Sequence, residues 1–244
     1  MIPFFRKIRY RLAKDNQFLK YSRYAIGEIV LVVIGILIAL AINNWNEEGN
    51  DNINKKLFKQ ALLEDLQKDT THINQNIKIA EHHIKVYGDR IIKFEKPDVT
   101  LDTIIKLYTM SSIPQMGIMP PNKTTFESLM STGNIKVFTE GEIRELMTFY
   151  DNIKLKYALI RYRYDYSFEK TQELSDKFGF LWKNEKNSPV YKTLIKEMNE
   201  GEFVRMYDLA LNRYVQASRF AKVNSEKLLT QTNELIETLS LDPD

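Results

Sequence analysis

The three histidines are the side chains best suited to bind a metal ion or to transfer a proton. His72 and His83 stand eleven positions apart, which is about 16 Å along a helix and too far to share a metal. His82 and His83 are adjacent and would point to different helix faces, whereas helical zinc pairs are spaced i, i+4. The chain has no cysteine, which excludes thiolate metal sites and thiol nucleophiles. We therefore expect structural or solvated histidines and no metal or other cofactor.

A cluster of charged residues, Glu64, Asp65, Lys68 and Asp69, also has side chains that could do chemistry. Glu64 and Lys68 form an i, i+4 pair, which is typical of a solvated helix face. The nine glycines are dispersed and form neither a phosphate-binding loop nor a nucleophile elbow. We therefore expect that the protein is not an enzyme, unless distant residues converge in space.

Glu28 is the only charged residue between positions 24 and 42. A carboxylate inside an apolar membrane helix is costly, and by default it indicates an ion site, a proton site or a contact with a partner. Glu28 lies near the end of the segment, however, where it could sit at headgroup depth and bond to Arg23 or Tyr24. Both interpretations remain open.

The apolar segment around this carboxylate is long enough to cross a membrane. Residues 24–42 number 19 and would form a helix of about 28 Å, close to the roughly 30 Å hydrocarbon thickness of a bilayer. Trp45 follows at the position of an interfacial anchor. Ala39 and Ala41 also fit the small-x-small rule of a signal peptide, so cleavage after Ala41 stays open. We favour a retained transmembrane helix over residues 24–46.

The net charge of +3 is distributed unevenly along the chain. Residues 1–24 carry +6, residues 25–42 carry −1 and residues 43–244 carry −2. Because basic residues mark the cytoplasmic side of a span, we expect residues 1–23 in the cytoplasm and residues 47–244 on the exported side of the membrane. The basic arm has the pattern of an amphipathic helix on an anionic cytoplasmic leaflet, and the acidic body argues against nucleic-acid binding.

Gly27, Gly35 and Ala39 share one stripe of the apolar helix, where small side chains let a second helix approach closely. Leu31 interrupts this stripe between the two glycines. A packing face here would support an alternative function, a membrane-active homo-oligomer that serves as a conduit or transport accessory and in which Glu28 lines the pore or a proton site.

The body, residues 47–244, has the heptad-like spacing of long helices. Three runs place apolar residues at alternating steps of three and four, at 63–91, 143–178 and 203–235. The first stripe comprises Leu63, Leu66, Thr70, Ile73, Ile77, Ala80, Ile84, Tyr87 and Ile91. We expect an all-α fold in which long helices form an antiparallel bundle with short accessory helices.

Two capping boxes mark helix starts in the body. Thr124 and Glu127 predict a short helix that ends at Gly133, a natural left-handed C-terminal residue. Thr139 and Glu142 predict the start of the second long helix.

The connection between the first two long runs contains a predicted short helix at about 100–110 and then an apolar loop. Met116, Ile118 and Met119 in this loop suit a partner-binding tip, because Met side chains adapt to many surfaces. The loop could instead fold back and cap the bundle core. A last short helix is predicted at 190–199, ended by Gly201.

Several segments resemble a known protein family. Residues 4–9 (FFRKIR), 20–21 and 24–47 (YAIGEIVLVVIGILIALAINNWNE) resemble the opening of a family of uncharacterised single-pass inner-membrane proteins of Bacteroidota, especially flavobacteria. Residues 121–135 (PNKTTFESLMSTGNI), 143–146 and 149–150 resemble the family's central motif.

The resemblance covers essentially the whole chain. It implies an uncleaved inner-membrane anchor with a periplasmic helical domain, and it implies no activity, cofactor or catalytic residue. Together with the residue patterns, it favours a non-enzymatic interaction, scaffold or sensor-like module. The expected partners are the lipid bilayer and either another protein or further copies of the chain.

Overall fold

The computed structural model describes residues 18–110, 113–114, 118–183 and 185–241, and every regular element in them is a helix. The prediction of an all-α fold is confirmed. The chain divides into two compact units, Met1–Leu57 and Phe58–Asp244. Most of the predicted N-terminal arm lies outside the described residues.

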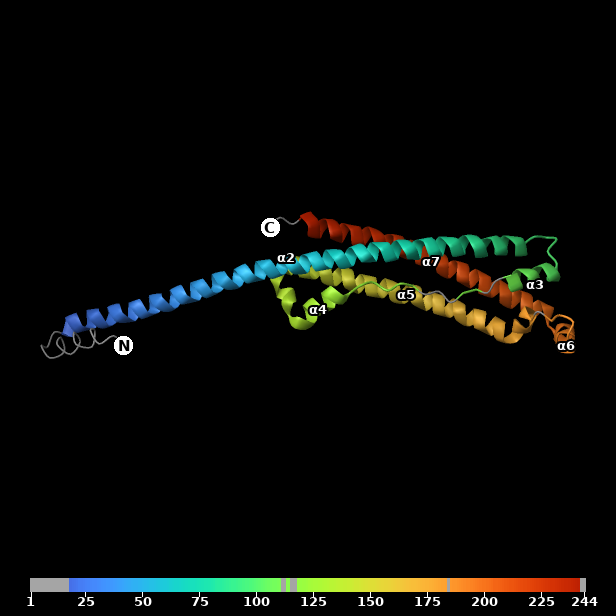
Figure 1. Ribbon diagram of the computed structural model, residues 1–244, viewed down its shortest axis with the longest axis horizontal. Helices are drawn as coiled ribbons and strands as arrows, with labels where there is room; N and C mark the ends of the chain where they lie inside the picture. The colour runs from blue at the N-terminus through green and yellow to red at the C-terminus, as the bar shows by residue number, and fades with distance from the viewer. Residues whose placement is uncertain (1–17, 111–112, 115–117, 184, 242–244) are drawn as a thin grey trace. The chain divides into compact units, whose positions relative to one another are not determined.

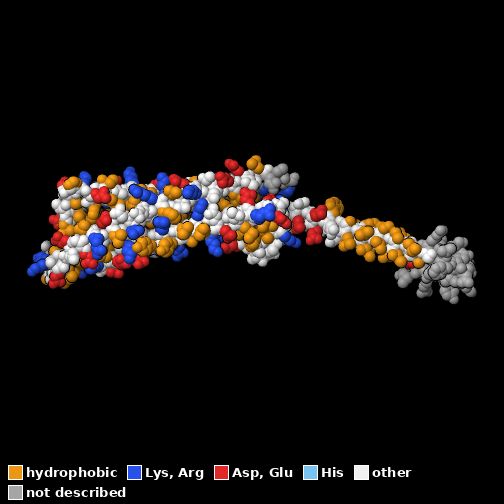
Figure 2. Space-filling view, turned by 180° about the vertical axis from the view of Figure 1, so that it is seen from behind, with side chains coloured by type: hydrophobic (Ala, Val, Ile, Leu, Met, Phe, Trp, Pro, Cys, Tyr) orange, Lys and Arg blue, Asp and Glu red, His pale blue; other side chains and the backbone are white. Residues whose placement is uncertain are grey.

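Helix α2 runs over Phe18–Phe94 and contains the predicted apolar segment. Among the described residues, it is the one helix long and apolar enough to cross a membrane, with a mean hydropathy of 2.9 in its most apolar window. None of that window is buried within the protein. Figure 2 shows apolar side chains gathered along the face of this helix that is in view. The chain therefore carries one candidate membrane span, near its N-terminus.

Three long helices form the frame of the second unit: α2 from residue 58 onward, α5 (Glu140–Phe178) and α7 (Glu200–Leu241) (Figure 1). The start of this part of α2 and the start of α5 share a core cluster with the end of α7. Helix α7 therefore runs antiparallel to the other two, as expected. Helices α2 and α5 run parallel, because the long connection between them returns the chain to its starting end.

Short helices occupy the connections. Helix α3 (Leu101–Met110) and helix α6 (Pro189–Glu197) form where short helices were predicted. The single turn η2 (Gly179–Trp182) contacts both of them, and the single turn η1 (Asn134–Val137) follows and contacts helix α4 (Thr124–Thr132). The predicted stop at Gly201 is wrong. The Asn199 side chain accepts a bond of 3.0 Å from the backbone N–H of Glu202, so it caps α7 and Gly201 lies in the first turn.

The two predicted capping boxes have different outcomes. Thr139 accepts from the N–H of Glu142 at 3.3 Å, and the Glu142 carboxylate accepts from the N–H of Thr139 at 2.7 Å, so the second box is confirmed. The first is wrong, because helix α4 (Thr124–Thr132) already includes Thr124 and has Lys123 at its N-cap without a side-chain bond. Its predicted end is confirmed: Gly133 has φ of 73°, which a residue without Cβ adopts at low cost.

The core consists of two clusters. One is rich in aromatic residues and lies where α3 and η2 meet the long helices, and the other is mostly aliphatic and includes Leu129 of α4. The predicted stripes of the second and third runs are largely buried. On α2, Leu62, Asp69 and Asn76 are buried instead of the predicted positions one residue later, so its inner face is rotated toward preceding residues.

Candidate functional site

The predicted membrane residues all lie on α2. Gly27, Gly35 and Ala39 are exposed, and a Cβ atom added at either glycine would meet nothing within 4 Å. Glu28 is half-buried, and Trp45 is 78% exposed. The stripe is therefore open to a second helix, and the roles of these residues remain predictions.

The described residues of the predicted partner loop pack against other parts of the second unit, to which the loop belongs. Met116 lies outside the described residues. Ile118 packs against the aromatic core cluster, and Met119 is 37% exposed. The Met119 backbone forms two bonds with the Asn76 side chain, at 3.3 Å from its N–H and 3.4 Å to its carbonyl. These contacts agree with a loop that folds back onto the body.

Asp65 joins α2 to the start of α4. One carboxylate oxygen accepts from the N–H of Thr125 at 3.1 Å and from its hydroxyl at 2.7 Å, and the other accepts from the Asn122 amide at 2.7 Å. A negative charge at a helix N-terminus is favourable, because the first N–H groups have no partner within the helix. Asp65, on α2, therefore caps the N-terminus of α4, which is the role that the sequence predicted for Thr124.

Asp69 is fully buried one turn further along α2. Its Oδ1 accepts from the backbone N–H of Asn122 at 2.7 Å, whereas Oδ2 has no hydrogen-bond partner. Burial raises the pKa of this carboxyl to about 6, although the Asn122 bond and the nearby His72 oppose the rise. The prediction of a solvated acidic face is therefore wrong for Asp65 and Asp69, and holds only for the exposed Glu64 and Lys68.

The histidines occupy separate surroundings. His83 is half-buried and its Nδ1 lies 3.1 Å from the hydroxyl of Tyr214, and burial lowers the pKa of its imidazole. His82 is exposed, and the buried Nδ1 of His72 has no hydrogen-bond partner. No three His, Asp or Glu side chains of the described residues form a group that could hold a metal ion.

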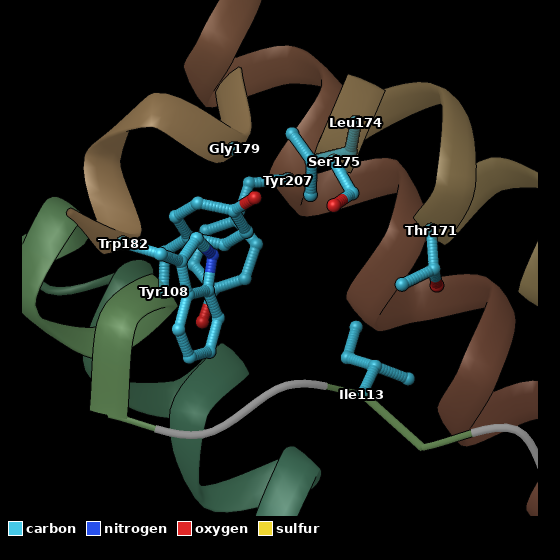
Figure 3. A pocket seen from close by; sticks show the side chains of 8 residues that line it. All are labelled: Tyr108, Ile113, Thr171, Leu174, Ser175, Gly179, Trp182 and Tyr207. Atoms are coloured by element: carbon cyan, nitrogen blue, oxygen red, sulfur yellow. The ribbon is translucent and has the colours of Figure 1, made fainter. Parts of the chain in front are cut away.

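A cavity of about 360 Å³ lies between α3, η2, α5 and α7. Figure 3 shows the rings of Tyr108, Trp182 and Tyr207 grouped on one side of it. The rings of Tyr108 and Trp182 meet edge to face at 5.4 Å, and those of Tyr108 and Tyr207 at 5.5 Å. The other described residues that line it are Ile113, Thr171, Leu174, Ser175 and Gly179.

The cavity has a buried floor and an exposed rim. Tyr108, Leu174 and Tyr207 are buried, whereas Ser175 and Trp182 are exposed. The hydroxyls of Tyr108 and Tyr207 are buried without a hydrogen-bond partner. Burial raises the pKa of the Tyr108 hydroxyl, with Trp182 and Ser175 opposing the rise, so this phenol stays protonated near neutral pH.

Sequence reasoning missed both the buried carboxylates and the cavity. Asp69 left a signal, since it lies on a stripe of buried residues at alternating steps of four and three, formed by Leu62, Leu66, Asp69, Ile73, Asn76 and Ala80. The cavity left none, because its described lining comes from three stretches that are far apart in sequence, at 108–113, 171–182 and 207.

The sequence model of one family, described as a family of unknown function (DUF6090), matches residues 28–209. That match spans most of the candidate membrane span and reaches the first part of α7. No curated protein and no solved structure matches the chain.

Proposed function

The chain belongs to the DUF6090 family of proteins of unknown function, and we propose that it is a membrane-anchored, non-enzymatic interaction module. The apolar part of α2 holds it in a bacterial inner membrane, with the basic arm on the cytoplasmic side. The helical body then lies in the periplasm, where it binds a partner or ligand in the manner of a sensor domain.

One observation carries this proposal: an exposed apolar helix precedes a body that has hydrophobic cores of its own. Side chains such as Leu31 and Ile36 are 65% and 56% exposed, and large exposed apolar surfaces indicate membrane or protein contact. A bilayer would remove these side chains from water at no cost to backbone hydrogen bonds, because a helix satisfies them internally.

Membrane attachment can be tested with two matched pairs of substitutions. Val33→Lys with Leu37→Lys should move the chain from the alkali-resistant membrane fraction to the soluble fraction, because each lysine costs about 2.5–3.5 kcal/mol at the centre of a membrane helix. Leu155→Lys with Leu159→Lys changes side chains of α5 with similar exposure, 59% and 45%, and should leave the chain in the membrane. If both double variants were found in the same fraction, membrane attachment through the apolar part of α2 would be contradicted.

The interaction role needs a separate test. Cross-linking of the intact protein in its native membrane should join lysines of the body to one recurrent partner or to a second copy, as identified by mass spectrometry. Cross-links that stay within single chains would contradict it.

The open stripe at Gly27 and Gly35 favours a second candidate function, a membrane-active homo-oligomer. Native mass spectrometry should then show oligomers, and Glu28→Gln should abolish conductance or assembly while leaving insertion intact. Monomers alone, or unchanged behaviour of Glu28→Gln, would exclude it.

A further inference from the structure

The cavity behind Tyr108 has the size of a small-molecule site. Its volume of about 360 Å³ falls within the range of ligand pockets, roughly 300–1,000 Å³. The exposed rim at Ser175 and Trp182 gives an entry from solvent, and the buried floor supplies aromatic and aliphatic surface. This combination suits a compact, largely apolar molecule.

The described residues of the wall are uncharged. None of the eight described residues that line the cavity is acidic or basic. Arg90, whose charge opposes the rise in the pKa of Tyr207, is not among them, and its guanidinium lies 4.9 Å from the centre of the Tyr87 ring. An ionic ligand would therefore lose its hydration without a countercharge in the wall, which is costly.

Two hydroxyls of the wall, those of Tyr108 and Tyr207, are buried without a hydrogen-bond partner, and Tyr108 lies next to the exposed rim residue Trp182. Tyr108 is only 6% exposed, and its buried hydroxyl has no hydrogen-bond partner, although Ser175 and Trp182 lie near enough to affect its pKa. An unpaired buried donor is costly. Because the phenol stays protonated, an acceptor atom on a ligand would remove that cost.

We propose that this cavity binds a small neutral aromatic compound that carries a hydrogen-bond acceptor such as a carbonyl oxygen. Its rings pack against Tyr108, Trp182 and Leu174, and its oxygen accepts from the Tyr108 hydroxyl. The inference deepens the proposed interaction role and rests on it for biological meaning, but binding at the cavity does not require the membrane anchor.

Benzophenone is a suitable probe, since it is a neutral aromatic ketone that cross-links on illumination and so reports its own location. The full chain is labelled in lipid nanodiscs and digested, and the modified peptides are identified by mass spectrometry. Labelling should saturate on peptides that contain Tyr108, Ile113, Thr171 or Trp182. Labelling confined to the apolar part of α2, or no saturable labelling, would overturn the proposal.

Two variants test the chemistry of the wall. Tyr108→Phe keeps the ring and should raise the half-saturating concentration about three- to tenfold, the effect of one lost hydrogen bond. Tyr150→Phe is the matched control, because Tyr150 is also buried with an unpaired hydroxyl but lies in the other core cluster, and it should not change labelling. Equal shifts in the two variants would contradict a bond to Tyr108.

Ser175→Leu places a larger side chain at the exposed rim, where it does not disturb the core. It should abolish labelling of the cavity peptides without changing the circular dichroism, and undiminished labelling would contradict entry at this rim. Phenyl benzoate, which has an acceptor oxygen, should compete with the probe, whereas diphenylmethane and 4-benzoylbenzoate should compete about three- to tenfold more weakly.

The two proposals fail in different ways. Cavity labelling in a chain that alkali releases from membranes would contradict the anchor and leave the ligand site standing. Firm membrane attachment without cavity labelling would contradict the ligand site alone.

Discussion

Asp65 determines where α4 begins, through three hydrogen bonds to Asn122 and Thr125. Asp65→Ala should lower the free energy of unfolding by about 1.5–3 kcal/mol, because bonds to a charged acceptor are lost and their donors stay partly buried. Urea unfolding of the detergent-solubilised chain measures this change. Glu64→Ala removes an exposed neighbouring carboxylate and should shift the free energy by less than about 0.5 kcal/mol. An equally mild effect of both changes would contradict the cap.

Asp69 should make stability depend on pH. Its folded pKa of about 6 lies above the unfolded value of 3.8, so its contribution to stability is fully present below pH 3.8 and is lost as pH rises through 6. The full effect is up to about 3 kcal/mol. Asp69→Asn keeps an acceptor for the Asn122 N–H and removes the titration. Relative to this variant, the wild type should lose unfolding free energy between pH 4 and pH 7.5, with His72 present in both. Parallel pH profiles would contradict a raised pKa.

Among the elements, α5 begins at a capping box and α4 does not. Thr139→Ala should therefore cost about 1 kcal/mol of stability, the usual effect of a lost N-cap. Thr124→Ala provides the comparison, since Thr124 already lies inside α4 and is exposed. Thermal unfolding followed by circular dichroism should separate the two variants. A larger loss of stability in Thr124→Ala than in Thr139→Ala would support Thr124 as the N-cap of α4, as predicted from the sequence, and contradict the structure.

The long helices could be predicted because apolar periodicity and the Thr139 box are local signals. The start of α4 could not, since the residue that caps it belongs to α2. The predicted buried face of α2 is displaced by about one residue from the observed one. Asp69 and Asn76 are polar and so look exposed in the sequence, but the loop that contains Asn122 and Met119 packs on them and buries them. The cavity likewise depends on how four helices meet.

At the scale of the whole molecule, the second unit has both core clusters. Deletion of residues 1–57 should therefore leave a soluble, helical, cooperatively folded domain. Circular dichroism and sedimentation velocity would check this expectation, with the full chain in detergent as the reference. Aggregation or loss of helix would show that the body depends on the apolar part of α2.

The most direct test of the membrane-anchored module uses the absence of native cysteine. Single cysteines are introduced by Asn16→Cys in the basic arm and Asn187→Cys in the body, and cells with a permeabilised outer membrane receive a membrane-impermeant maleimide. If the chain is anchored as proposed, the Asn187→Cys variant is labelled at once, and the Asn16→Cys variant is labelled only after detergent dissolves the inner membrane. The reverse pattern, or equal labelling at both positions without detergent, would contradict it.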